Sequence, residues 1–210
     1  SSPYRPMTQG LVSRRAVLLT SLAGLVVCVA VFGAYARFNL VLGAVACAGL
    51  ATYTPMKRLW YAGPLYNAWI VVVLALMAFL AAGGDLAGQP LEVMLGVAGA
   101  VLFGYANFVL TGYFKDIAAD RPTGYRTLPV VFGRKVSARV SNILAAHTAG
   151  SALVASLPFR SARPWPGVLF LIAGFVYILL AQVRLRSVSE DRAAHRAIAP
   201  VVHGYMLMLS

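Results

Sequence analysis

The sequence predicts an all-α fold, a polytopic bundle of transmembrane helices, and three observations lead to this class. Hydrophobic residues make up 60% of the chain and charged residues only 11%, whereas a soluble domain usually has about 25% charged residues to cover its surface. The mean hydropathy is +0.77. The apolar residues also gather in runs of about 20, the length that crosses a bilayer as a helix. We therefore expect a single membrane domain over residues 1–210.

The apolar runs and their flanking residues predict six complete spans and the start of a seventh. The second run is short, because Pro55 follows it and a proline in a helix interior removes a backbone hydrogen bond. Gly83 and Gly84 close the third run. The expected spans are Ala16–Ala36, Asn39–Thr54, Leu65–Ala82, Leu91–Tyr113, Val136–Leu157 and Trp165–Val183, with a seventh that starts near Ala197.

The net charge of +12 arises from 18 basic residues and 6 acidic ones. The basic residues lie between apolar runs and form no stripe on a polar domain, so nucleic acid is not an expected partner. When the loops are assigned to alternate sides, one side receives fifteen of the basic residues and the other only Arg37, Arg160 and Arg163. Basic residues gather in cytoplasmic loops. This asymmetry predicts that the basic side faces the cytoplasm. The location that we expect is a bacterial inner (plasma) membrane, in which the chain is an integral protein.

A charged loop, residues 115–135, carries the most informative pattern. Asp116 and Asp120 are four residues apart, and on a helix this spacing places both carboxylates on one face, about 5–6 Å apart at Cβ. Like charges so close repel each other unless a cation lies between them. Mg²⁺ is a suitable cation because it binds through one or two carboxylates together with phosphate oxygens and water. The spacing therefore indicates a magnesium site for a phosphate-bearing substrate.

Basic residues close to the two aspartates leave two interpretations open. Lys115, Arg121 and Arg126 can bind phosphate oxygens directly. Alternatively, Lys115 and Arg121 form surface ion pairs with the aspartates at a solvated loop and have no catalytic role. The same choice applies to the adjacent basic pair after the second span, which either binds phosphate or anchors the helix at the membrane surface with its long side chains.

Polar and aromatic residues within the apolar runs are candidates for the wall of a binding pocket. Asn67 is one, because an unpaired amide is costly in an apolar environment. Asn39 lies near a span end and could line the pocket or cap a helix. Tyr53 and Tyr113 could line it too, although both positions also suit the aromatic belt at a membrane interface.

Several of these segments resemble one known family, in the same order along the chain. The second aspartate-rich motif of the UbiA superfamily of membrane prenyltransferases is similar to the run Asp116-x-x-x-Asp120-Arg121-x-x-Gly124, followed by Leu128-Pro129-Val130 and Gly133. Other segments that resemble the family are Arg5-Pro6 with Gly10 and Ser13, Asn39 with Tyr53-Thr-Pro-Met-Lys57-Arg58, and Gly63–Gly84 with Asn67. The resemblance extends over nearly the whole chain.

The resemblance implies Mg²⁺-dependent transfer of an isoprenoid chain from a prenyl diphosphate to an aromatic or other lipid-pathway acceptor, as in quinone biosynthesis. It makes Asp116 and Asp120 the catalytic and metal-binding residues. It implies diphosphate contacts from Lys57, Arg58, Lys115, Arg121, Arg126 and Arg5. It implies a pocket lined by Asn67, Tyr53, Tyr113 and Asn39. The expected partners are the two small-molecule substrates and membrane lipid.

The chain departs from the family pattern at three points. The family's first aspartate motif would lie just before Arg5 and is absent. Tyr113 stands where the second motif usually has its first acidic residue. The family has nine helices, and about six and a half are expected here, so we interpret the chain as truncated at both ends and without the first two family helices. The activity then belongs to the intact parent protein.

Two other functions compete with the enzyme. The chain could be an inactive relic that lost the first motif, which the sequence before Ser1 would decide. It could instead be a transporter, but transporters usually carry ionisable residues within their spans. All six acidic residues here are expected in loops or at span ends, which favours the enzyme.

Overall fold

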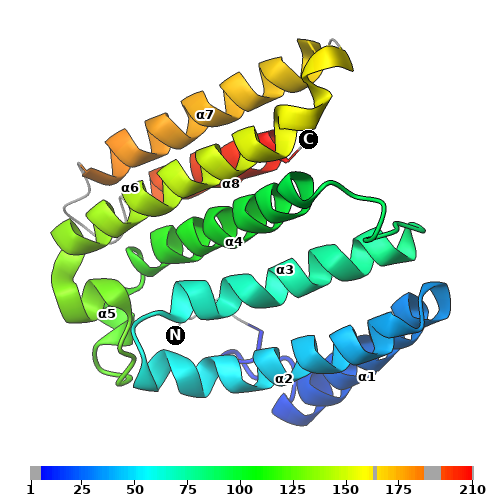
Figure 1. Ribbon diagram of the computed structural model, residues 1–210. Helices are drawn as coiled ribbons and strands as arrows, with labels where there is room; N and C mark the ends of the chain where they lie inside the picture. Colours follow the sequence, from blue (N-terminus) through cyan, green and yellow to red (C-terminus); the bar gives the residue numbers. More distant parts are fainter. Residues whose placement is uncertain (1–5, 163–164, 187–194, 210) are drawn as a thin grey trace. The chain divides into compact units, whose positions relative to one another are not determined.

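The computed structural model describes residues 6–162, 165–186 and 195–209, and all regular elements in these ranges are helices (Figure 1). The elements are α1 (Arg14–Tyr35), α2 (Phe38–Leu59), α3 (Gly63–Ala81), α4 (Leu91–Tyr113), α5 (Ile117–Asp120), α6 (Leu128–Ser156), the 3₁₀ helix η1 (Leu157–Ala162), α7 (Trp165–Arg186) and α8 (His195–Met208). In these ranges six helices, namely α1, α2, α3, α4, α6 and α7, are long and apolar enough to cross a membrane. The prediction of an all-α membrane protein with six complete spans is confirmed, and α8 covers the expected start of a seventh.

The helices form two compact units, residues 1–48 with 73–84 and residues 49–72 with 85–210. The first unit contains α1, the first half of α2 and the end of α3. The side chain of Ser13 caps α1 by accepting a hydrogen bond from the N–H of Ala16 at 3.1 Å. Asn39 is fully buried, and its amide donates to the carbonyls of Phe32 and Met77, both at 3.1 Å. This amide therefore links all three helices within the first unit.

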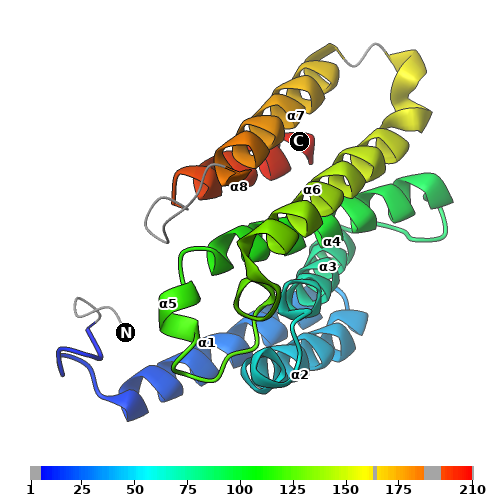
Figure 2. The same ribbon diagram turned by 90° about the vertical axis from the view of Figure 1, so that its left-hand side faces the viewer.

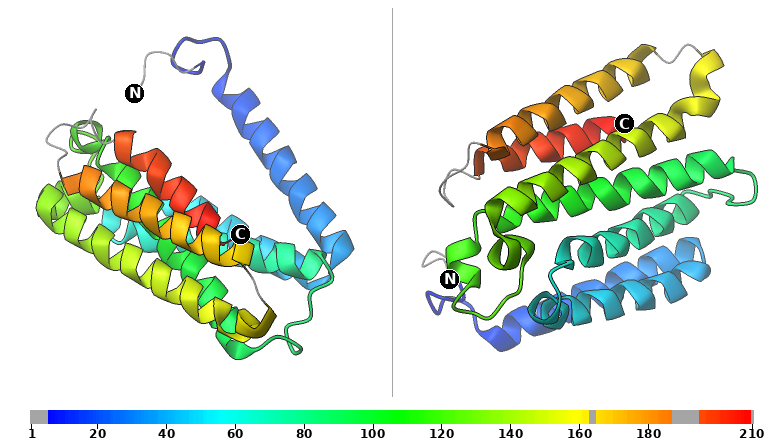
Figure 3. Two further views of the ribbon diagram at one scale, coloured as in Figure 1. Left: turned by 90° about the horizontal axis from the view of Figure 1, so that it is seen from above. Right: turned by 60° about the vertical axis from the view of Figure 1, so that its left-hand side comes forward.

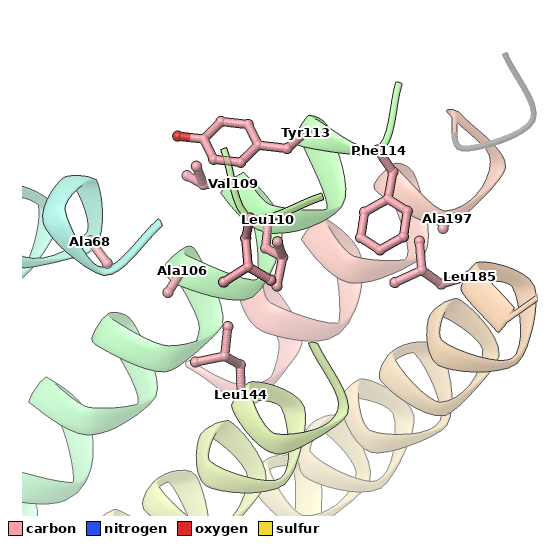
Figure 4. Packing of buried hydrophobic residues seen from close by; sticks show 10 residues of the cluster. Ala68, Ala106, Val109, Leu110, Tyr113, Phe114, Leu144, Leu185 and Ala197 are labelled. Carbon is pink, nitrogen blue, oxygen red and sulfur yellow. The ribbon is translucent and has the colours of Figure 1, made fainter. Parts of the chain in front are cut away.

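The second unit holds the larger core, where α4, α6, α7 and α8 lie side by side (Figure 3). Buried side chains from all four helices, or from the turns that follow them, meet in one cluster, in which Leu110 and Phe114 pack with Leu144, Leu185 and Ala197 (Figure 4). Small residues let the backbones approach closely, as is usual for helices in lipid. A Cβ added to Gly174 of α7 would lie only 2.8 Å from the carbonyl oxygen of Gly204 in α8.

Two helix boundaries lie five or more residues from their predicted positions. The helix α2 continues through Pro55 to Leu59, so the expectation that it stops near Thr54 is wrong. A proline this close to the helix end removes a single hydrogen bond, and the last turn still forms. As a result, the Lys57–Arg58 pair lies on the final helical turn, and Tyr53 and Lys57 share one helix face because they are four residues apart.

The helix α6 begins at Leu128 and not at Val136, so residues 115–135 are not the loop that the charges suggested. Thr127 occupies the N-cap position, and Pro129 lies in the first turn, where a proline is tolerated because its missing N–H needs no partner. Gly133 then interrupts the helix with φ 78° and ψ 171°, a conformation that glycine adopts readily because it has no Cβ. The helix resumes at Arg134 and continues to Ser156.

Candidate active site

The site is built on the connection between α4 and α6, which contains the short helix α5 (Figure 2). The backbone carbonyl of Asp120 accepts hydrogen bonds from the N–H groups of Thr123 and Tyr125, both at 3.2 Å, and from the Thr123 hydroxyl at 2.8 Å. The N–H of Arg126 donates to the carbonyl of Lys57 at 3.1 Å. The connection is therefore folded around Asp120 and is hydrogen-bonded to the end of α2.

The side chain of Asp120 lies at the centre of this arrangement and is only 7% exposed. Its Oδ1 is 3.2 Å from the Nζ of Lys57, which is 16% exposed, and the two groups form an ion pair. Its Oδ2 accepts a longer hydrogen bond, 3.4 Å, from the hydroxyl of Thr127. The alternative of a solvated surface pair with Arg121 does not hold for Asp120, because its carboxylate is buried and the ion pair is formed with Lys57.

Aromatic rings hold Lys57 in place. Its Nζ lies 4.8 Å from the ring centre of Tyr113 and 4.4 Å from that of Tyr125, within the range of a cation–π attraction. The hydroxyls of Tyr53 and Tyr113 are 2.7 Å apart and share a hydrogen bond. The guanidinium of Arg58 lies 5.5 Å from the Tyr125 ring centre. We call Tyr53, Lys57, Tyr113, Asp120 and Tyr125 the Lys57–Asp120 cluster.

Several other predicted residues lie on the same connection between α4 and α6 as Asp120. Asp116 is half-buried and occupies the N-cap position of α5, and its carbonyl accepts the Asp120 N–H at 2.7 Å. The two aspartates are thus one helical turn apart, as the spacing predicts. Lys115, Arg121 and Arg126 are exposed, so their charges face solvent.

The remaining predicted residues lie on α3, in the first unit or outside the described residues. Asn67 is half-buried and follows Gly63 by one turn of α3. A Cβ added to Gly63 would lie 2.7 Å from the Tyr113 hydroxyl, so this face of α3 is directed at the cluster. Asn39 belongs to the other unit, where its amide is bonded to backbone carbonyls. Arg5 lies outside the described residues.

Sequence reasoning missed Tyr125 and Thr127. Both lie within the segment that resembles the family motif, and the signal that could have indicated them is that they flank the charged residue Arg126. Their contacts with Lys57 and Asp120 depend on α2 reaching beyond Pro55, which the sequence did not indicate.

The donor atoms fit a hard divalent cation. Asp116 and Asp120 provide carboxylate oxygens, and Mg²⁺ requires only one or two of these when phosphate oxygens and water complete its shell. An ionised carboxylate has about four acceptor positions, so the contacts with Lys57 and Thr127 leave capacity on Asp120. The described part of the chain contains no group of three or more His, Cys, Asp or Glu residues that could hold a metal without such a substrate.

Comparisons with known proteins give one consistent result. The model of the UbiA prenyltransferase family matches residues 1–206. The digeranylgeranylglyceryl phosphate synthase of Halobacterium salinarum is 28% identical over 200 residues, which cover 94% of this chain and 68% of that protein. The enzyme of the same name from Natronomonas pharaonis is 30% identical over 181 residues, covering 86% of this chain and 59% of that protein. No solved structure matches the chain.

Proposed function

Because the chain belongs to the UbiA prenyltransferase family, we propose that it transfers an isoprenoid chain from a prenyl diphosphate to a lipid-pathway acceptor at the Lys57–Asp120 cluster, with Mg²⁺. The observation that carries this proposal is the buried ion pair of Lys57 and Asp120 at the end of an apolar helix bundle. A charged pair is costly to bury and is weak support for stability. Its presence here is therefore better explained by function than by folding.

The basic residues suit the leaving group of the reaction. Diphosphate departs from an allylic carbon when the negative charge that develops on its oxygens is stabilised. Lys57 supplies a positive charge whose position is fixed by two aromatic rings. Arg58 and Arg126 lie on the adjoining segments and are exposed, so they can reach phosphate oxygens from the solvent side. A guanidinium binds two such oxygens at once.

Asp116 and Asp120 are the residues that would hold Mg²⁺. Members of this family generally use this ion to bind diphosphate, and when bound it acts as a Lewis acid on the phosphate oxygens. Without substrate, Lys57 neutralises Asp120. With substrate, the Lys57 ammonium would stay over the two rings and bind the diphosphate from there, and Asp120 would use its remaining acceptor positions as a ligand.

The class of acceptor that we propose rests on similarity to the relatives. Both relatives are named for digeranylgeranylglyceryl phosphate, so an acceptor of the glyceryl phosphate class is the first to test. An aromatic acceptor is the second class to test, since the family resemblance implies either class of acceptor. The isoprenoid chain itself is apolar and would lie among the helices behind the Tyr53–Tyr113 pair.

The orientation belongs to the same proposal. We place the cluster at the cytoplasmic side of the plasma membrane, because fifteen of the 18 basic residues fall on that side of the expected topology. Water-soluble diphosphate esters made in the cytoplasm would then reach the site directly.

The test is an assay of the whole polypeptide that contains this chain, in membranes, with radiolabelled prenyl diphosphates and a panel of glyceryl phosphate and aromatic acceptors. Product should form with Mg²⁺ and disappear with EDTA. Asp116→Asn and Asp120→Asn should each lower the rate at least a hundredfold, since each removes a charge from the leaving-group site. Glu92→Gln, at the opposite end of α4, is the matched control and should keep the rate. No product with any acceptor, as for an inactive relic, would contradict the proposal.

A further inference from the structure

A second cationic site lies between α6 and α7, apart from the Lys57–Asp120 cluster. It is a groove of about 520 Å³. Its lining in the described part of the chain is Arg134, Lys135, Ala138, Arg139, Asn142, Leu185 and Arg186. Four of these residues are basic, one is an amide and none is acidic. None of them belongs to the cluster, so the groove is a separate feature of the second unit.

The basic side chains converge from two helices. Lys135 and Arg139 are four residues apart on α6, and Asn142 is three residues further, so these three share one helix face. Arg186 is the last residue of α7. Membrane anchoring by basic residues requires only that each reaches the surface. It does not explain why like charges from two helices line one groove, which no acidic residue of the described part of the chain lines and which a bound anion would therefore stabilise.

The floor and flanks of the groove indicate the kind of anion. Ala138 and Leu185 give it an apolar floor. The same two helices, α6 and α7, also expose apolar side chains, with Val183 64% and Ile143 56% exposed, as expected for surfaces that face lipid. A cationic mouth with apolar flanks matches an amphipathic ligand better than free phosphate.

We propose that this groove binds the phosphate headgroup of an anionic phospholipid, with its acyl chains along the exposed faces of α6 and α7. Basic pockets between transmembrane helices on the cytoplasmic side are known to suit such headgroups, and each basic residue near an anionic surface contributes about fivefold in affinity. The proposal does not depend on the prenyl transfer reaction, because the groove shares no residue with the catalytic cluster.

The test is lipid retention by the purified full chain, measured by native mass spectrometry with added phosphatidylglycerol or phosphatidylcholine. Wild type should retain phosphatidylglycerol preferentially. Arg139→Gln with Arg186→Gln should weaken retention about twenty-five-fold, from two fivefold losses. The matched control is Arg14→Gln with Arg15→Gln, an exposed basic pair at the start of α1, which removes the same charge and should leave retention unchanged.

Inorganic phosphate at millimolar concentration distinguishes the two sources of a phosphate group. Two results together support a headgroup site. Inorganic phosphate should displace the lipid only at concentrations far above that of the lipid, and the variant Arg139→Gln with Arg186→Gln should lose the lipid. Three results would overturn the proposal: equal retention of both lipids, equal losses in the groove and control variants, or complete displacement by phosphate at concentrations near that of the lipid. Size-exclusion profiles of both double variants establish that they are folded, since all four arginines are exposed.

Discussion

Removal of Lys57 should destabilise the protein more than removal of its partner. Lys57→Met keeps the length of the side chain but leaves the Asp120 carboxylate buried, at 7% exposure, without its cation. Breaking a buried pair in this way costs about 3–5 kcal/mol. Lys57 is itself 16% exposed, so some water reaches the site, and we expect the lower end, about 3 kcal/mol.

Asp120→Asn should cost less, about 1–2 kcal/mol, because the two tyrosine rings still hold the lysine ammonium and solvent is nearer to it. The double variant Lys57→Met with Asp120→Asn removes both charges at once. It should recover about 2 kcal/mol relative to the sum of the single changes, the usual size of coupling between residues in direct contact.

The assay is the apparent free energy of unfolding in mixed micelles, from titration with SDS, for the wild type and the three variants. Lys115→Met is the matched control, because Lys115 is exposed and lies on the same α4–α6 connection as Asp120 but takes no part in the ion pair. Equal stability of Lys57→Met and Lys115→Met would refute the reasoning. All three cluster variants should also lose the proposed prenyl transfer, so recovery of stability in the double variant separates the structural role of the pair from its proposed catalytic role.

Two further predictions concern packing and topology. Gly174→Ala should destabilise the protein by about 1–3 kcal/mol, because its Cβ would lie 2.8 Å from the Gly204 carbonyl oxygen. Gly150→Ala in α6 should be neutral or slightly stabilising in the same titration, because its Cβ would meet no atom within 4 Å beyond its own stretch of helix. A reporter enzyme fused after Arg134 should be active in the cytoplasm and one fused near Gly84 on the external side; the reverse pattern would contradict the proposed orientation.

The sequence was most informative where one physical cause acts alone. Apolar runs of membrane length fix the helices, and α4 has the predicted bounds, Leu91–Tyr113. The prediction was wrong for α2 and α6, where local signals were overridden. Pro55 lies near the end of α2, where a lost hydrogen bond matters little. The first turns of α6 were missed because Arg134 and Lys135 interrupt the apolar run there.

The candidate site could be predicted as a set of residues but not as a set of contacts. The spacing of Asp116 and Asp120 is local, and the structure keeps them one helical turn apart. The partner of Asp120 is 63 residues away in the sequence, and no periodicity in a single sequence reports such a pair. The contacts of the aromatic rings with Lys57 could not be predicted for the same reason. Tyr113 and Tyr125 reach Lys57 only after α2, α4 and the α5 connection have packed together.

In the proposed reaction, the location of the cluster suits the two chemically different parts of a prenyl diphosphate. Its diphosphate end needs fixed positive charge, which is costly at the centre of a bilayer, and its chain needs an apolar environment. Only the end of a helix bundle offers both within a short distance. The extra turn of α2 after Pro55 places Lys57 one turn beyond Tyr53. The Tyr53–Tyr113 hydrogen bond therefore lies one turn nearer the middle of α2 than the ion pair does. In the proposed reaction, the two phenol rings would mark the boundary between the diphosphate and the isoprenoid chain.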